Sequence, residues 1–212
     1  MRFRRKKDAV DETPVDEAGE QPVADAADDD PRAAGPYDVS EVDDDVERVD
    51  LGSLLITPED EREVRLQVDE ATDAVQSVLI AGPDGAVEFR AFAAPRHGDM
   101  WSQARPQIQA DAAQRGGTAT EREGRFGIEL MLQQQVQMPD GSPGVQPSRV
   151  VGINGPRWFL RATFLGKPAV DPDDATAWDD TLAAVVVNRG GDAMPPGDPL
   201  PLTLPASARR QS

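Results

Sequence analysis

The densest apolar segment of the chain runs from residue 149 to 165, with the sequence RVVGINGPRWFLRATFL. Its second half alternates apolar side chains with others from Trp158 to Phe164. A period of two residues is typical of a β-strand that turns one face toward a core. Since Asn154-Gly155 is a pair that tolerates the positive φ of hairpin turns, the segment predicts two strands joined by a tight turn at that pair.

Phe159 and Arg161 fall on the opposite face of the second predicted strand. Two interpretations remain open. In the first, Trp158 and Phe159 are core residues, and the sheet is covered in part on both faces. In the second, the two aromatic side chains face a ligand or a partner, and Arg157 and Arg161 contact its anionic groups. His97 belongs to the same candidate surface in this second interpretation.

Further strands are predicted on both sides of a helix. Apolar or alternating segments at 51–56, 62–69, 75–82 and 86–93 are separated by short connections, which favour an antiparallel meander of four strands. TATEREG, at 118–124, predicts an edge strand, and the segment 126–138 predicts another strand. The stretch PDGSPGVQP, at 139–147, is rich in turn residues and predicts an exposed loop.

Two helices are predicted. The first starts after Asp99, a suitable N-cap, and runs to the glycine pair at 116–117, with Pro106 expected to bend it. The second follows the acidic residues at 171–174 and carries Trp178 on its apolar side. The β-branched residues 185–187 either end this helix or form a short strand. The Pro-rich segment at 195–205 predicts an extended strap across the domain.

The order of these elements is strands, helix, strands, helix, without the βαβ alternation of a parallel sheet. This order predicts an α+β domain with a mostly antiparallel sheet of about seven to nine strands, packed by two main helices. We expect this single domain to span residues 51–205, followed by a frayed C-terminus at 206–212.

Charge separates the first fifty residues from the rest of the 212-residue chain. The net charge is −17, and residues 8–50 alone contribute −15. A segment this acidic, with few large apolar side chains, cannot bury enough surface to offset its ordering entropy. Residues 1–50 are therefore predicted to be a disordered charged tail. Its basic tip consists of Arg2, Arg4, Arg5, Lys6 and Lys7.

The amino-acid composition gives little support for a metal site or a catalytic site. The chain has no cysteine and one histidine, His97, so zinc sites and histidine-based triads are poorly supported. His97 and Asp99 are the best acid–base pair, but residues two apart at a helix entry usually serve as caps. The acidic runs at 43–45 and 171–174 match no calcium-loop pattern. We expect no catalytic residue, no metal and no cofactor.

The segments RFGIELMLQ, VVGINGPRWFLRATFLG and AWDDTLAAVVVNRGGDAMPPGDPLPL resemble an uncharacterised actinobacterial family, a domain of unknown function. The resemblance covers most of 51–205 and is most specific in the segment GPRWFLR. It implies a soluble, intracellular α+β protein with a basic tip and an acidic tail, and it implies no catalytic residues.

The first functional hypothesis is a non-catalytic, cytoplasmic protein-interaction module. The second is a protein that binds a small molecule, either a nucleotide or an acyl ligand, or an enzyme. In both cases the pocket would lie near Arg157 and Arg161. The third is an electrostatic tether, in which residues 1–7 contact an anionic membrane or nucleic acid. No transmembrane segment is expected, because no apolar run approaches the length of a span.

Overall fold

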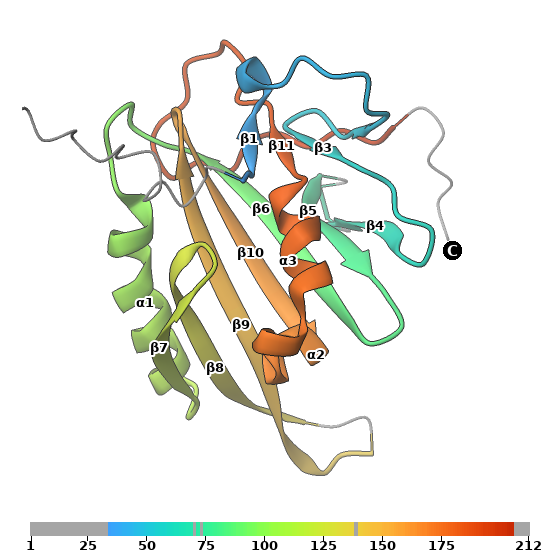
Figure 1. The fold of residues 1–212 in the computed structure, drawn as a ribbon. Helices are drawn as coiled ribbons and strands as arrows, with labels where there is room; N and C mark the ends of the chain where they lie inside the picture. Colours follow the sequence, from blue (N-terminus) through green and yellow to red (C-terminus); the bar gives the residue numbers. More distant parts are fainter. Residues whose placement is uncertain (1–33, 70, 73, 138–139, 206–212) are drawn as a thin grey trace, which may run out of the picture.

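The fold is built on a seven-stranded antiparallel sheet (Figure 1). The computed structural model describes residues 34–69, 71–72, 74–137 and 140–205. In spatial order the strands are β4 (Glu63–Val68), β5 (Val75–Ala81), β6 (Gly85–Ala93), β10 (Trp158–Gly166), β9 (Pro143–Gly155), β8 (Gly127–Gln137) and β7 (Thr118–Gly124). The α+β class predicted from the sequence is confirmed, and 118–124 is an edge strand as expected.

A second, four-stranded sheet lies beside the first. Its order is β1 (Tyr37–Asp38), β11 (Val186–Val187), β3 (Leu54–Ile56) and β2 (Val49–Asp50). The predicted four-strand meander is therefore wrong at its first strand, because β3 pairs with β2 and β11 and only β4, β5 and β6 are consecutive neighbours. Periodicity identifies a strand but not the sheet to which it belongs.

The folded chain begins earlier than residue 51. The short helix η1 (Val39–Glu41) lies between β1 and β2, and β1 pairs in parallel with β11. Asp38 is buried and accepts a hydrogen bond from the indole of Trp158, 2.8 Å away. The predicted disorder is wrong for residues 34–50, because backbone pairing and one buried hydrogen bond hold a segment that its composition would leave unfolded. Residues 1–33 lie outside the described residues.

The two faces of the large sheet carry separate cores. On one face lies α1 (Met100–Gln114), which packs on β7, β8 and β9. Asp99 caps this helix by accepting a hydrogen bond from the backbone of Ser102, and Pro106 lies inside it. The apolar residues buried on this side are Trp101, Ala112, Leu130, Leu132, Val150 and Phe159.

The opposite face is covered by α3 and the small sheet (Figure 1). The chain reaches α3 (Thr176–Ala183) through α2 (Lys167–Val170) and the short helix η2 (Pro172–Asp174). The helix ends at Ala183, so residues 186–187 form a strand and not a helical turn. The larger core lies here and includes Phe89, Trp158, Leu160, Phe164, Trp178 and Leu182.

The central hairpin forms as predicted, but its turn is displaced by two residues. Trp158 pairs with Gly155, so the two turn residues are Pro156 and Arg157, and Arg157 has a φ of 63°. Proline followed by a residue at positive φ is the pattern of a type II turn. Gly155 has a different role, because a Cβ atom there would lie 2.1 Å from the Trp158 ring.

The expected loop at 139–147 is also wrong for its second half. Residues 143–147 form the start of β9 and pair with Gln133–Gln137 of β8. The ribbon extends beyond the last pair between β9 and β10, Ser148 with Leu165. Pro143 and Pro147 are compatible with a strand because its outer edge is unpaired there, so no ladder bond is lost.

The C-terminal strap follows the prediction. Isolated bridges join Leu202 to Gly52 and to Val75, and Pro199 to Phe92. The amide of Leu200 also donates to the carbonyl of Ala91. The strap therefore fills the edge of β6 beyond its last pair with β5, Val78 with Phe89. Residues 206–212 lie outside the described residues, so the predicted fraying is untested.

Candidate functional site

The α1 side of the large sheet is only partly covered by the helix. α1 packs on β7, β8 and β9, while the neighbouring strands β10 and β6 present half-buried polar side chains on the same side. Alternation along these strands places Phe159, Arg161 and Thr163 of β10 beside Glu88, Arg90 and Phe92 of β6. We call the surface formed by Glu88, Arg90, Phe92, Arg161 and Thr163 the open face.

Two arginines lie opposite each other on the open face. Arg161 of β10 and Arg90 of β6 form a cross-strand pair, an arrangement in which like charges repel. The Nε atom of Arg90 lies 2.5 Å from Oε1 of Glu88. Arg161 forms no ion pair with a carboxylate of the described residues. Burial, together with the charge of Arg90, lowers the pKa of Arg161, and Glu88 offsets this only in part.

A row of aromatic rings borders the arginine pair. The ring of Phe159 lies 6.2 Å from Trp101 and 6.0 Å from Phe92, and both pairs are stacked. The guanidinium carbon of Arg161 lies 5.6 Å from the centre of the Phe92 ring, close enough for a cation–π contact. The open face therefore places two guanidinium groups beside the half-buried ring of Phe92.

Gly152 explains how α1 approaches the sheet so closely here. It lies opposite Arg161 in the register of β9 and β10. A Cβ atom at this position would lie 2.3 Å from the Trp101 ring and 2.9 Å from Phe159. The Trp101 indole is also held by a hydrogen bond to the carbonyl of Ile128. Because Gly152 has no side chain, Trp101 of α1 can lie against the sheet there, and it forms one border of the open face.

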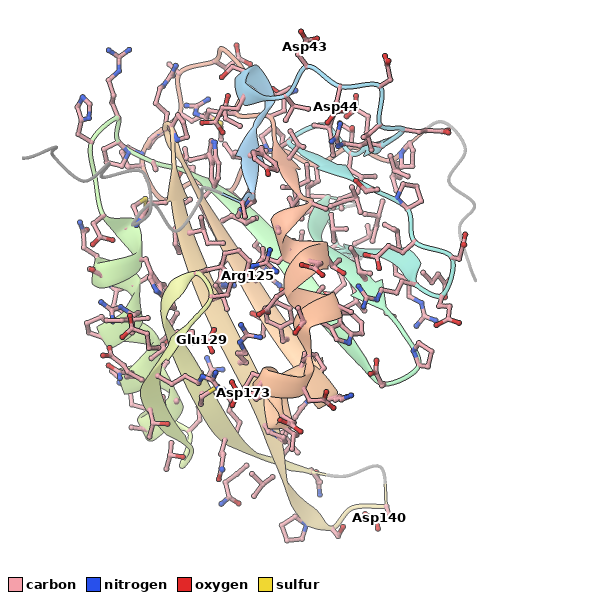
Figure 2. All side chains as sticks on the ribbon, in the orientation of Figure 1. Asp43, Asp44, Arg125, Glu129, Asp140 and Asp173 are labelled. Carbon is pink, nitrogen blue, oxygen red and sulfur yellow. The ribbon has the colours of Figure 1, made fainter. Side chains whose placement is uncertain are left out.

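A second charged cluster lies on the other side of the sheet, below α3. Arg149, which is 1% exposed, bonds Oε2 of Glu129 from Nε and Oδ1 of Asp179 from Nη1, each at 2.8 Å. Arg122 Nε lies 3.0 Å from Oε1 of Glu129, and Arg122 Nη2 lies 2.8 Å from Oδ1 of Asp173. In Figure 2, Glu129 and Asp173 lie between the β7–β8 hairpin and the segment of α2 and α3 to its right.

This buried ion cluster joins β7, β8 and β9 to η2 and α3. Burial raises the pKa of Glu129 and outweighs the opposite effects of Arg149 and Arg122. Gly124 leaves room for the carboxylate, since a Cβ atom there would lie 2.5 Å from it. Because each charged group has an opposite charge beside it, the cluster is better suited to fixing α3 on the sheet than to binding a ligand.

The structure separates the five surface residues named from the sequence. Phe159 and Arg161 share the α1 side of β10, whereas Trp158 is fully buried in the core on the opposite side. Arg157 lies in the turn before β10, and His97 is exposed in the loop before α1. Trp158 and Phe159 are therefore both excluded as surface residues, because Trp158 is 0% and Phe159 4% exposed, which confirms the interpretation that both are core residues.

The possible acid–base pair of His97 and Asp99 is also resolved by geometry. Oδ1 of Asp99 accepts hydrogen bonds from the backbone of Ser102 and from Nδ2 of Asn154, and these contacts belong to a helix cap. These hydrogen bonds lower the pKa of Asp99, with Ser102 as the main cause. Capping was the interpretation that the sequence favoured, and the contacts of Asp99 confirm it.

Sequence reasoning missed Arg90, Phe92 and the buried ion cluster. Arg90 and Phe92 belong to a strand that the alternation predicts, so their face could have been matched with that of Arg161. Glu129 and Arg149 carry no such signal, because a charged residue in a strand normally faces solvent. Their burial depends on partners in other elements.

The tether hypothesis concerns residues 1–7, which lie outside the described residues, and it stays a prediction. In the described part of the chain, no helix combines the length and the apolar character that a membrane crossing requires.

Comparison with known proteins gives a family but no activity. No curated protein matches the chain. Among solved structures, a crystal structure from Bacteroides thetaiotaomicron has a TM-score of 0.40 and 13% sequence identity, over 70% of this chain and 50% of that chain. The chain therefore spans half of that structure. The family described as "Protein of unknown function (DUF3710)" matches residues 35–211. This match includes the segment 35–50, in agreement with its place in the fold, and the chain belongs to the DUF3710 family.

Proposed function

We propose that the protein is a non-catalytic interaction module that binds an acidic segment of a protein partner on the open face. The observation that carries this proposal is Arg161: it is half-buried, lies opposite Arg90, and forms no ion pair with a carboxylate of the described residues. A carboxylate placed between the two guanidinium groups would relieve their repulsion and replace lost solvation with charge-assisted hydrogen bonds.

The surroundings of the arginine pair support a partner with apolar residues beside its acidic ones. The half-buried ring of Phe92, which stacks on the buried ring of Phe159, provides an apolar surface next to Arg161, and aromatic residues with arginine are the usual centres of binding energy in interfaces. An extended segment suits this geometry, because its side chains would alternate between the arginines and the rings along the strands. The cytoplasm is the proposed location.

The direct test titrates the full-length protein with a synthetic peptide in which glutamate alternates with leucine. Binding is measured by calorimetry and located by amide chemical shifts. We expect shifts concentrated on β6 and β10, and a loss of binding when glutamine replaces the glutamates of the peptide. Arg161→Gln should weaken binding at least about tenfold, the effect of removing one charge-assisted contact.

Arg96→Gln is the matched control, because Arg96 is an exposed arginine in the loop before α1. Its affinity for the peptide should equal that of the wild type. Equal losses in both variants would contradict the proposal, since they would indicate attraction by overall charge. A mononucleotide or a fatty acid that shifts the β6 and β10 signals, where the peptide shifts none, would replace the partner with a small-molecule ligand.

A further inference from the structure

We propose that the acidic segment at residues 8–33 of this chain docks on the open face and competes there with the partner. This inference rests on the proposed function, because it concerns the regulation of the same surface. Residues 8–33 carry ten acidic side chains and one arginine. The protein would then hold its own acidic competitor next to the site.

Charge complementarity favours the open face over the rest of the surface. Residues 34–212 carry a net charge of −13, so most of the domain repels an acidic segment. Many of the described arginines already have a carboxylate partner, as Arg62 has Glu59 and Arg125 has Asp180. Arg161 differs from these because its ring and strand neighbours shield it from water, while no carboxylate of the described residues forms an ion pair with it.

Burial makes this position more favourable than an exposed arginine. A charge–charge attraction strengthens as the effective dielectric constant falls, by about fourfold between bulk water and the surface of a protein. Arg96 and Arg115 are exposed, so contacts with them are screened by solvent. Arg90 and Arg161 lie side by side and can share successive acidic residues of one extended segment.

The length of the segment and its point of attachment allow this docking. Gly35 lies against the carbonyl of Ala183, at the end of α3, which places the start of the described chain on the side of the sheet away from the open face. The 26 residues from 8 to 33 span up to about 85 Å when extended. A domain of this size has a radius of gyration of about 16 Å, so the segment can pass around an edge of the sheet.

Covalent attachment would make even a weak contact effective. A tethered segment experiences an effective concentration of about 1 mM. If the free segment bound with a Kd of about 0.1 mM, the tethered one would occupy the site most of the time and weaken the apparent affinity of a partner about tenfold. Competition of this strength would leave the site accessible to a partner that binds more tightly than the segment.

Docking can be observed in the full-length protein, because the chain has no cysteine. A single Ala18→Cys substitution would accept one nitroxide label, and amide signals near the label lose intensity. At low ionic strength we expect this loss at Leu79, Arg90 and Thr163, on the α1 side of β5, β6 and β10. The loss should be absent when the ten acidic residues of 8–33 are replaced by asparagine or glutamine, a change that leaves residues 34–212 intact.

Arg90→Gln with Arg161→Gln is the second variant, and unchanged signals elsewhere would show that its fold is retained. It should also abolish the intensity loss at Leu79 and Thr163. Equal broadening in wild type and both variants, or broadening confined to other surfaces, would overturn the inference.

The affinity of the glutamate–leucine peptide separates this inference from the proposed function. We expect the full-length protein with the neutralised segment to bind the peptide about tenfold more tightly than the wild type. Equal affinities, both reduced by Arg161→Gln, would refute the competing segment and leave the proposed function intact. If neither protein bound the peptide, both the proposed competition and the proposed function would be wrong.

Discussion

Trp158 donates its indole N–H to Oδ2 of Asp38 at 2.8 Å, across 120 residues of sequence. Trp158 is fully buried at the start of β10, the central strand of the large sheet, and Asp38 is 7% exposed at the end of β1. The bond connects the segment before residue 50 with the middle of the large sheet. Asp38 also accepts from the backbone of Ser40, so one carboxylate serves both the tryptophan and the start of η1.

Replacement of Asp38 by alanine should therefore lower the free energy of unfolding by about 1–3 kcal/mol, because it leaves a buried N–H without this acceptor. Asp38→Asn keeps an oxygen acceptor and should retain most of the stability. Urea denaturation measures the free energy of unfolding of both variants. Asp43→Ala, an exposed neighbour, is the control and should change stability by no more than about 0.5 kcal/mol.

Arg149→Met should destabilise the fold strongly, by about 3–5 kcal/mol, because it leaves the buried carboxylates of Glu129 and Asp179 without their shared partner. The control is Arg125→Gln, which removes a more exposed ion pair with Asp180 worth no more than about 1 kcal/mol. Thermal and urea unfolding measure the loss of stability in each of the two variants. Similar stability losses for both variants would show that the buried ion cluster does not hold α3 on the sheet.

Gly152→Ala should displace Trp101 from its place over the sheet, since the added Cβ would lie 2.3 Å from the ring. Such overpacking costs about 1–3 kcal/mol and should shift the tryptophan fluorescence. Gly191→Ala is a suitable comparison, because nothing lies within 4 Å of its Cβ position. Wild-type stability and fluorescence in Gly152→Ala would contradict the close contact between α1 and β9.

Asp99 should contribute stability that depends on pH. Its hydrogen bonds with Ser102 lower its pKa in the folded state, so the unfolded state binds the proton more readily. The contribution is therefore present above the ordinary pKa of an aspartate, about 3.9, and is lost as the pH falls through the folded-state value. Unfolding of wild type and Asp99→Asn, measured over a pH series, should converge at the acid end. Ser102→Ala should reduce the effect, because it removes the hydroxyl donor.

The basic tip supports a prediction of its own. If residues 1–7 act as a tether, the full-length protein should sediment with vesicles that contain anionic lipid and should be released by moderate salt. Each of the five cations adds at most about 1 kcal/mol. Replacement of Arg2, Arg4, Arg5, Lys6 and Lys7 by glutamine should abolish sedimentation. Binding that persists in salt, or in this variant, would rule out an electrostatic tether at the tip.

The sequence by itself determined features that depend on near neighbours. The alternation from Trp158 to Phe164 correctly assigned each side chain to a face, because the period of a strand is a local property. Asp99 correctly marked the start of α1, since a cap acts within one turn. The α+β class follows from the order of such elements and needs no knowledge of their partners.

Only the tertiary structure decided which elements pair and which charges are buried. The turn falls at Pro156-Arg157 and not at Asn154-Gly155, because Gly155 is needed beneath the Trp158 ring. A charged residue in a strand normally faces solvent, yet Arg149 and Glu129 are buried because they pair with each other across neighbouring strands and Arg149 also pairs with Asp179 of α3. Arg90 and Arg161 likewise meet only when β6 and β10 pair. Contacts across many residues of sequence leave no local period, so the open face could not be assembled from the sequence alone.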